Sequence, residues 1–275
     1  MASYPAKQIY EPGYQSPEMH RFVTKYFLDK TIQSGRFNDV SLGKHRATQK
    51  KVIIKTIYTK YYRKLKEASF LKKLVNVPGV ITYLDQYYIN PHLHLLVLEY
   101  FGEMTLKRFL NQYGPISECT THTIFKQLVS TVHSCFSMNI LHRKIKLSNI
   151  LINVRSLQIK LINFNSASHF DNDNDQFNTT LCTEIAPPEY FTKRIYSADG
   201  LYIWTLGLVL YEMLFNRQPF SCPNNVVRTP CSVYSKKPLS LDVELLVSWM
   251  LTKLSNKRIT INELTHHPWI SKKWI

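Results

Sequence analysis

The sequence predicts an α+β fold, with a five-stranded antiparallel sheet in its N-terminal half and mostly helices in its C-terminal half. Three observations lead to this prediction. Alternating or β-branched runs precede Phe101, apolar residues recur at helical spacing after it, and 44% of the 275 residues are hydrophobic. A chain of this length and composition can bury a large core, as one domain or as two packed lobes.

The N-terminal elements follow from local pattern. Residues 1–21 are rich in Pro, Tyr, Ser and Gln without periodicity, and we expect a flexible arm there, followed by a domain over 22–275. Strands are expected at 26–32, 38–43, 51–57, 81–88 and 93–100. Between the third and fourth strands, Leu65, Ala68, Leu71 and Leu74 form one helical stripe.

The C-terminal half, from about residue 101 to 275, shows helical periodicity. Apolar residues recur every three to four positions in 124–136, 201–214 and 241–251. Two short apolar runs, 150–152 and 157–162, suit a small hairpin. The predicted domain therefore has an N-lobe over about 22–100 and a helical C-lobe after it.

The charge and the cysteine content indicate which partners and which compartment to expect. Lys and Arg number 35 against 19 Asp and Glu, and the span from Lys44 to Lys73 holds eleven cations with Glu67 as its single acid. Such a field attracts acidic partners. The five cysteines form no metal-binding spacing, so we expect reduced thiols. With no run of about twenty apolar residues, we expect no membrane span and an intracellular protein, cytoplasmic or nuclear.

Several motifs in order resemble those of eukaryotic protein kinases. They are VIIK (Val52 to Lys55), LHRKIKLSNILIN (Leu141 to Asn153), KLINFN (Lys160 to Asn165), APPEY (Ala186 to Tyr190), WTLGLVLYEML (Trp204 to Leu214), Arg258 in KRITINEL, and HPWI (His267 to Ile270). The sequence looks most similar to the calmodulin-kinase-like group, which includes PAS kinase and the PIM kinases. The resemblance implies a bilobal kinase-like fold in which the helix after the third strand is αC.

The resemblance also implies a nucleotide site, part of which is retained. Lys55 matches the lysine that holds the α- and β-phosphates, and Glu67 matches its αC partner. The other positions implied to contact nucleotide are Gly35, Val40, Ile53, Leu98, Glu99, Phe101 and Leu151. The glycine-rich loop keeps only Gly35, and Ile53 replaces an alanine beside the adenine, so we expect degraded ATP binding.

The matched catalytic positions have lost their carboxylates. Lys144 replaces the aspartate of HRD, and a lysine ammonium, with an ordinary pKa of about 10.4, does not accept a proton at neutral pH. Asn163 replaces the metal-binding aspartate of DFG, beside Asn149, the second metal ligand. Neutral amides are weak ligands for Mg²⁺. The resemblance therefore gives Lys144, Lys146 and Asn149 as the catalytic candidates, and we expect Lys144 to be inactive as a base.

Positions with structural roles are better kept. His142 and Phe164 match two members of the regulatory spine, and Glu189 and Arg258 match the ion pair that fastens the activation segment. Tyr202 stands where the family has an αF aspartate. Arg143 matches the arginine of HRD, which in the family meets a phosphate on the activation segment. In that segment, Thr179 and Thr180 are candidate phosphorylation sites.

We therefore expect a pseudokinase, a kinase-like protein without catalysis that regulates or scaffolds kinase signalling. The expected partner is another protein, such as an active kinase or its substrate, with an acidic partner at the basic αC region as a further prediction. No cofactor is expected. Two alternatives stay open: a weak Ser/Thr kinase that uses ATP with Mg²⁺, and a basic module on a kinase scaffold, for which nucleic acid is the less favoured ligand.

Overall fold

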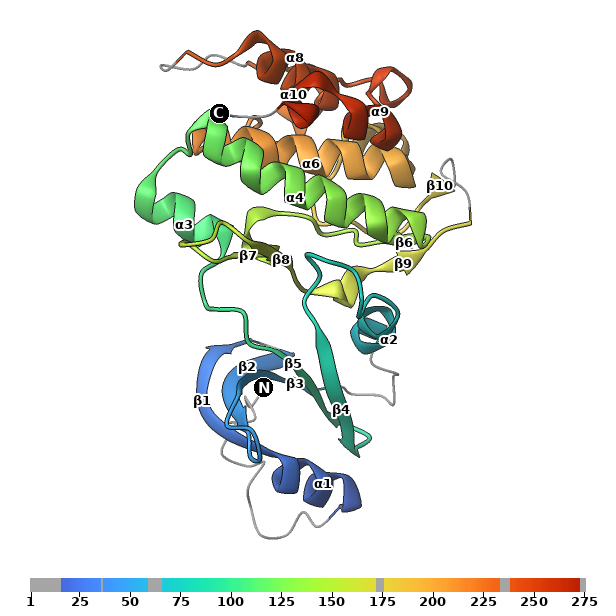
Figure 1. Cartoon of the computed structure of the whole chain (residues 1–275). Helices are drawn as coiled ribbons and strands as arrows, with labels where there is room; N and C mark the ends of the chain where they lie inside the picture. Colours follow the sequence, from blue (N-terminus) through green and yellow to red (C-terminus); the bar gives the residue numbers. More distant parts are fainter. Residues whose placement is uncertain (1–15, 36, 59–65, 172–175, 233–237, 273–275) are drawn as a thin grey trace. The chain divides into compact units, whose positions relative to one another are not determined.

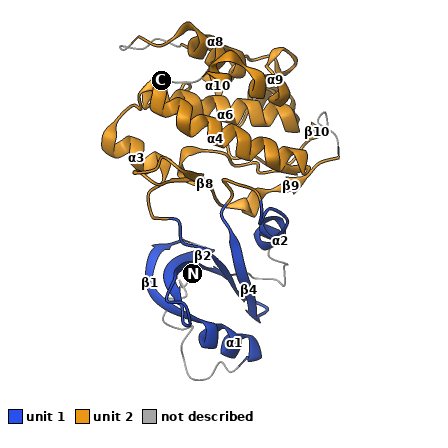
Figure 2. Cartoon of the chain, viewed as in Figure 1, with its two compact units in different colours: residues 1–76, 81–101 blue, residues 77–80, 102–275 orange. Residues whose placement is uncertain are grey.

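A computed structural model describes residues 16–35, 37–58, 66–171, 176–232 and 238–272. The chain divides into two units (Figure 2): residues 1–76 with 81–101, and residues 77–80 with 102–275. The first unit is built on a sheet, and the second is mainly helical (Figure 1). The α+β class predicted from the sequence is confirmed.

The sheet of the first unit has five strands in the order β1-β2-β3-β5-β4, and every neighbouring pair is antiparallel. The strands are β1 (Tyr26–Ser34), β2 (Asn38–His45), β3 (Lys51–Tyr58), β4 (Tyr83–Asn90) and β5 (Leu93–Glu99). Alternate side chains point to opposite faces, and this places Val52 and Ile54 on one face and Ile53 and Lys55 on the other. The predicted five-stranded antiparallel sheet is confirmed.

A helix that the sequence did not predict covers one face of this sheet. Helix α1 (Pro17–Lys25) begins after Ser16, whose side chain accepts a hydrogen bond from the backbone of Met19. Met19 and Phe22 pack with Tyr26, Tyr87 and the core residues of β3 and β5. The predicted arm, 1–21, therefore ends earlier than expected: residues 17–21 are helical, and 1–15 lie outside the described residues.

Helix α2 (Lys66–Lys73) corresponds to the helix predicted after the third strand. Its buried side chains are Glu67, Ala68, Phe70 and Leu71. Of the four residues of the predicted stripe, Leu65 lies outside the described residues. Glu67 is thus a buried acid on a helix whose remaining ionisable residues are lysines.

The second unit is arranged around α6 (Ala198–Phe215), which packs against α4 (Glu118–Ser137) and α8 (Leu241–Met250). The other helices of the described residues are α3 (Leu106–Tyr113), α5 (Pro188–Lys193), α7 (Pro223–Arg228), α9 (Ile261–His266) and α10 (Pro268–Ser271). Among the described helices, α6 alone is long and apolar enough to cross a membrane. Of its 18 residues, 83% are buried within the protein. It is the core helix of this unit.

Short strand pairs hold the loops of this unit in place. They are β6 (Ile140–Leu141) with β9 (Ser168–His169), β7 (Ile150–Ile152) with β8 (Ile159–Leu161), and β10 (Gln176–Phe177) with β11 (Tyr196–Ser197). The β7–β8 pair is the small hairpin expected from the sequence. Single 3₁₀ turns lie at η2 (Leu147–Asn149), η3 (Phe164–Ser166) and η4 (Ser255–Lys257).

Candidate functional site

Lys55 lies in the middle strand of the sheet, on the face opposite α1. The antiparallel register sets Val40 across from Lys55, and Ile53 across from Leu98, so these four side chains share that face. Leu98 is buried, whereas Val40 and Ile53 are partly exposed. The sheet therefore groups four of the residues that the sequence assigned to nucleotide contact.

The Lys55 ammonium and the Glu67 carboxylate form an ion pair between β3 and α2. Their Nζ and Oε2 atoms are 2.5 Å apart, and the two side chains are 12% and 4% exposed. Breaking such a buried pair by removing one partner leaves an uncompensated charge, which typically costs about 3–5 kcal/mol. The pair thus anchors α2 to the sheet, with or without a nucleotide.

The turn between β1 and β2 is a closed hairpin. The Gly35 N–H donates to the Asn38 carbonyl at 2.9 Å, so this backbone donor is already used within the turn. Asp39 is 5% exposed and accepts a hydrogen bond from the Tyr58 hydroxyl at 2.8 Å. Burial and the Asp39 carboxylate raise the pKa of Tyr58 well above its ordinary value. The charge of Asp39 therefore serves a buried contact inside the sheet.

The last residue of β5, Glu99, is held by hydrogen bonds of its side chain. The Glu99 carboxylate accepts from the Thr82 N–H at 2.8 Å and from the Thr82 hydroxyl at 2.7 Å. Phe101 follows, partly exposed, and Leu151 lies in β7 of the second unit, also partly exposed. The two hydrogen bonds of Glu99 tie the end of β5 to the residue that precedes β4.

In the second unit, His142 forms the centre of the segment that matches HRD. Its Nε2 lies 3.0 Å from the Ile162 carbonyl, and its Nδ1 accepts from the Lys144 N–H at 3.1 Å, which fixes the tautomer. Complete burial lowers the pKa of His142 to about 4, so the ring is neutral. Phe164 meets this ring edge-on at 4.5 Å between centroids. The two spine candidates of this unit are in contact.

Tyr202 of α6 supports the same segment. Its hydroxyl accepts from the His142 N–H at 3.0 Å and donates to the Ile140 carbonyl at 2.6 Å. The side chain is 1% exposed, and burial raises its pKa well above the ordinary value, so the hydroxyl keeps its proton. One phenol thereby satisfies two buried backbone groups that would otherwise be costly to desolvate.

The two asparagines proposed as metal ligands bind each other. Asn163 Nδ2 donates to Asn149 Oδ1 at 3.2 Å, and Asn149 Nδ2 donates to the Lys144 carbonyl at 2.8 Å. Asn163 has a left-handed backbone, with φ 73° and ψ 58°, a conformation that asparagine tolerates better than most residues. The amide oxygen of Asn149, its one possible metal donor, is already engaged. Among the described residues no group of three His, Cys, Asp or Glu side chains is placed to hold a metal.

The two lysines of this segment have different surroundings. Lys146 forms an ion pair with Glu184, with 2.6 Å between Nζ and Oε2. Lys144 is partly exposed, and its backbone groups bind His142 and Asn149. In the sequence, Lys144 stands at the position that matches the aspartate of HRD.

The segment that matches the activation segment is held by several contacts. Arg143 Nη2 donates to the Thr180 carbonyl at 3.0 Å, and the Thr179 hydroxyl lies 2.8 Å from the Tyr196 hydroxyl. Phe177 stacks on Tyr196 at 5.5 Å, next to the β10–β11 pair. These contacts hold Phe177, Thr179 and Thr180 in place in the unmodified chain.

Glu189 and Arg258 form a two-pronged ion pair. Arg258 Nη1 and Nη2 lie 2.7 and 2.6 Å from the two carboxylate oxygens of Glu189, and Nη1 also donates to the Gly200 carbonyl at 3.1 Å. Arg258 is 7% exposed. A buried bidentate pair of this geometry fixes α5 against the start of α6.

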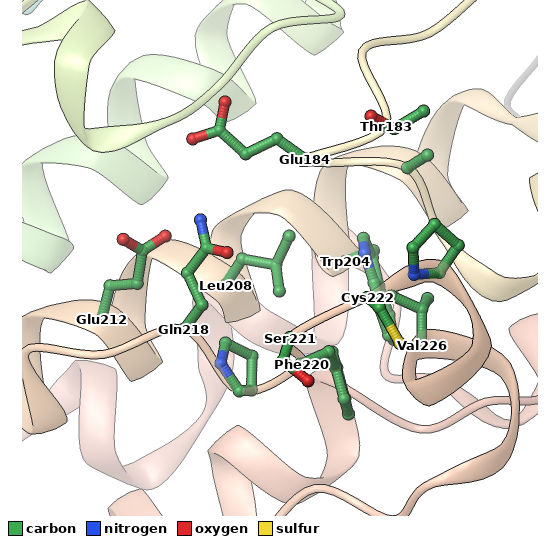
Figure 3. A pocket seen from close by; sticks show the side chains of 13 residues that line it. Thr183, Glu184, Trp204, Leu208, Glu212, Gln218, Phe220, Ser221, Cys222 and Val226 are labelled. Atoms are coloured by element: carbon green, nitrogen blue, oxygen red, sulfur yellow. The ribbon is translucent and has the colours of Figure 1, made fainter.

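A small cavity is lined by residues of 183–186, by α6 and by the residues that follow α6 (Figure 3). Its volume is about 180 Å³. Its polar end carries Glu184, Glu212 and Gln218, and its apolar end includes Trp204 and Phe220. Burial holds the pKa of the Glu212 carboxyl above its ordinary value, even with Lys107 at 3.5 Å. Nucleotide-sized pockets usually exceed about 300 Å³, so this cavity is not a nucleotide site.

Comparison with known proteins identifies the family. Residues 26–270 match the protein kinase domain. The chain belongs to the protein kinase family. The match covers both units of the fold, from the first residue of β1 to α10.

The kinase relatives are Ser/Thr kinases and kinase-domain proteins at modest identity. The chain is 32% identical over 260 residues to the protein kinase domain-containing protein ppk9 of Schizosaccharomyces pombe, covering 90% of this chain and 48% of that protein. It is 28% identical to the probable serine/threonine-protein kinase MARK-A of Dictyostelium discoideum, covering 90% of this chain and 24% of that protein. It is 26% identical to human NUAK family SNF1-like kinase 1, covering 92% of this chain and 39% of that protein. The chain thus spans less than half the length of these three relatives.

Two features of this kinase site were missed from the sequence. The first is the dual role of the Tyr202 hydroxyl, and the second is the hydrogen bond between Asn163 and Asn149. The sequence offered a signal for the second one, because two amides at matched positions can donate to and accept from each other. For Tyr202 it showed only the loss of an aspartate, not which groups a longer side chain would reach.

Proposed function

We propose that this member of the protein kinase family is a pseudokinase, which regulates or scaffolds kinase signalling by binding and transfers no phosphate. The observation that carries the proposal is the hydrogen-bonded pair of amides, Asn149 and Asn163, at the two matched metal positions. Phosphoryl transfer depends on a divalent cation to neutralise developing charge and on a carboxylate that orients the attacking hydroxyl. A neutral pair whose Asn149 oxygen already accepts a hydrogen bond is a poor ligand set for Mg²⁺.

The position of the base supports the same proposal. Lys144 offers an amine at the position where phosphoryl transfer uses a carboxylate to accept the proton of the substrate hydroxyl. Two structural contacts of the kinase pattern are formed, one within each unit: His142 contacts Phe164, and Lys55 pairs with Glu67. A chain that has these contacts but lacks the matched carboxylates is suited to binding without catalysis.

The partner that we propose is another protein, an active kinase or its substrate, inside the cell in the cytoplasm or nucleus. No cofactor is part of the proposed function. The chain carries a net charge of +16, which favours partners with acidic surfaces. The described part of the basic segment includes Lys44 and Lys51, which lie opposite each other on β2 and β3. Like charges in direct register repel, and an anionic partner would relieve that repulsion.

One experiment separates this proposal from a weak Ser/Thr kinase, the alternative favoured by the intact Lys55–Glu67 pair. Purified protein is incubated with γ-labelled ATP and Mg²⁺ or Mn²⁺, alone and with a generic protein substrate, beside a Lys55→Ala variant. We expect equal background from both. Incorporation above background that the Lys55→Ala variant lacks would show that the chain is an enzyme.

The second alternative, a basic binding module, predicts a different result. Binding to a nucleic acid would weaken steeply as salt rises, because each neutralised phosphate releases a counterion. The residues that would govern such binding, Lys60, Arg63, Lys64 and Lys66, fall mainly outside the described residues. A variant with these four changed to Gln that binds RNA or DNA as the original does would exclude this alternative.

A further inference from the structure

Helix α8 has apolar side chains on both of its sides. Val243, Leu246, Val247 and Met250 are buried, and the helix packs against α6 and α10. The opposite side carries Leu241, Leu245 and Trp249, which are 67%, 39% and 47% exposed. We call these three residues the α8 stripe.

The spacing of the α8 stripe places its members on one surface. Residues four apart lie one above the other on a helix, so Leu241, Leu245 and Trp249 form a continuous line along α8. A helix at the surface of a soluble domain normally presents polar residues outward. Single exposed apolar side chains are common, but a row that includes a tryptophan marks a contact site.

Trp249 is held in position before any partner arrives. Its ring meets the ring of His267 edge-on, with 5.6 Å between centroids, and His267 is 7% exposed. His267 is itself fixed, because its Nδ1 accepts from the backbone N–H of Trp269. A large aromatic side chain that is already ordered loses little conformational entropy on binding, as is typical of interface hot spots.

The charge beside the stripe is opposite to that of the whole chain. From Leu241 to Thr252 the ionisable residues are Asp242 and Glu244, both acidic, in a chain with a net charge of +16. Asp242 is exposed and Glu244 is partly exposed. Acidic residues also suit the first turn of a helix, and in either case they are the charged side chains that α8 itself places beside the stripe.

We propose that the α8 stripe binds an amphipathic helix of another protein whose apolar face is flanked by Lys or Arg. The stripe supplies the apolar row, Trp249 supplies the anchor, and Asp242 and Glu244 select the basic flanks. A second copy of this chain suits the surface poorly, because pairing two α8 stripes would bring the acidic Asp242 and Glu244 of both copies close together. The inference does not depend on whether the chain transfers phosphate.

The test uses the full chain and a synthetic helical peptide of about 18 residues, long enough to cover the stripe. The labelled peptide has a leucine face flanked by lysines, and its matched control has the same face flanked by glutamates. Fluorescence anisotropy should show that the lysine peptide binds about tenfold or more tighter, with an affinity that falls as salt rises.

Variants then locate the binding. Trp249→Ala and Leu245→Lys should each weaken binding of the lysine peptide about tenfold or more, as expected for anchors at the centre of an interface. Tyr113→Ala, at a 57% exposed aromatic on α3, should leave it unchanged. The altered side chains are at the surface, so we expect all three variants to fold, and thermal melts would check this.

Several results would overturn the proposal. They are no binding of the lysine peptide, equal binding of the glutamate peptide, and binding that survives both stripe variants. Analytical sedimentation of the chain alone tests whether a second copy of the chain binds the stripe. A dimer that forms as the concentration rises and is absent in Leu245→Lys would assign the stripe to a second copy instead.

Discussion

At the scale of single residues, Tyr202 shows how one phenol can satisfy two buried backbone groups. Its hydroxyl donates to one backbone carbonyl and accepts from one backbone N–H, and a deprotonated carboxylate at that position could only accept. The segment that holds His142 is therefore supported by α6 without a buried charge.

Changing Tyr202 to Phe tests this support. The substitution keeps the ring and removes the hydroxyl, so the His142 N–H and the Ile140 carbonyl lose a buried partner. We expect the free energy of unfolding to fall by about 1–3 kcal/mol, measured by chemical denaturation. Tyr113→Phe, at an exposed tyrosine, is the matched control and should change it little. Equal stability of the two variants would mean that the hydroxyl of Tyr202 supports nothing.

His142 gives a prediction about pH. Its pKa is lowered to about 4 by burial, below the ordinary 6.5 of an unfolded histidine. Between these values the unfolded state binds the extra proton, so stability is complete above about pH 6.5 and falls as pH decreases toward 4. The full effect of this residue is of the order of 3 kcal/mol.

The measurement is urea denaturation at a series of pH values for the original chain and for His142→Phe. The variant loses two hydrogen bonds at every pH, so it should be less stable throughout. Its deficit should shrink as pH falls from 6.5 to 4, because the titrating group is gone. A deficit that stays constant across this range would show that His142 is not held neutral.

At the scale of elements, the sequence predicted the regular pieces well. The strands and the helices with strong apolar periodicity were found, with ends that differ by a few residues: 201–214 was predicted for α6, which spans Ala198–Phe215. Those patterns report burial directly. The motif spacing also placed Lys55 and Glu67 on elements that bring them together.

Helix α1 was missed because its signal is local and weak. Nine residues hold only two buried side chains, Met19 and Phe22, and the Pro and Ser before them also suit an extended segment. The helix is stabilised by packing against β3 and β5, whose residues are distant from α1 in the sequence. Short helices depend on such tertiary contacts more than on propensity.

Phe22→Ala tests whether α1 is part of the core of the first unit. Phe22 is fully buried, so the change removes apolar contact and leaves a cavity, and we expect a loss of about 3–5 kcal/mol in unfolding free energy. Phe37→Ala, at a phenylalanine of the same unit that is 61% exposed, is the control and should cost far less. Similar losses from both changes would remove α1 from the core.

At the scale of the whole molecule, the chain has a kinase fold with many buried apolar positions. The periodicity of these positions can be recognised in the sequence. The kinase motifs therefore predicted the architecture, whereas the contacts of Asn163, Asn149 and Tyr202 required side-chain positions. The α8 stripe was recognised from the exposure of its side chains, whereas periodicity alone predicted only a helix over 241–251.

The account rests on the proposal that this kinase fold no longer holds a metal–nucleotide complex. Isothermal titration of the full chain with ATP, with and without Mg²⁺, tests this most directly, and Asn163→Asp serves as a variant with one carboxylate restored. We predict weak or undetectable binding that Mg²⁺ does not strengthen. Tight binding of ATP by the original chain that requires Mg²⁺ would contradict the account and return the protein to the active kinases.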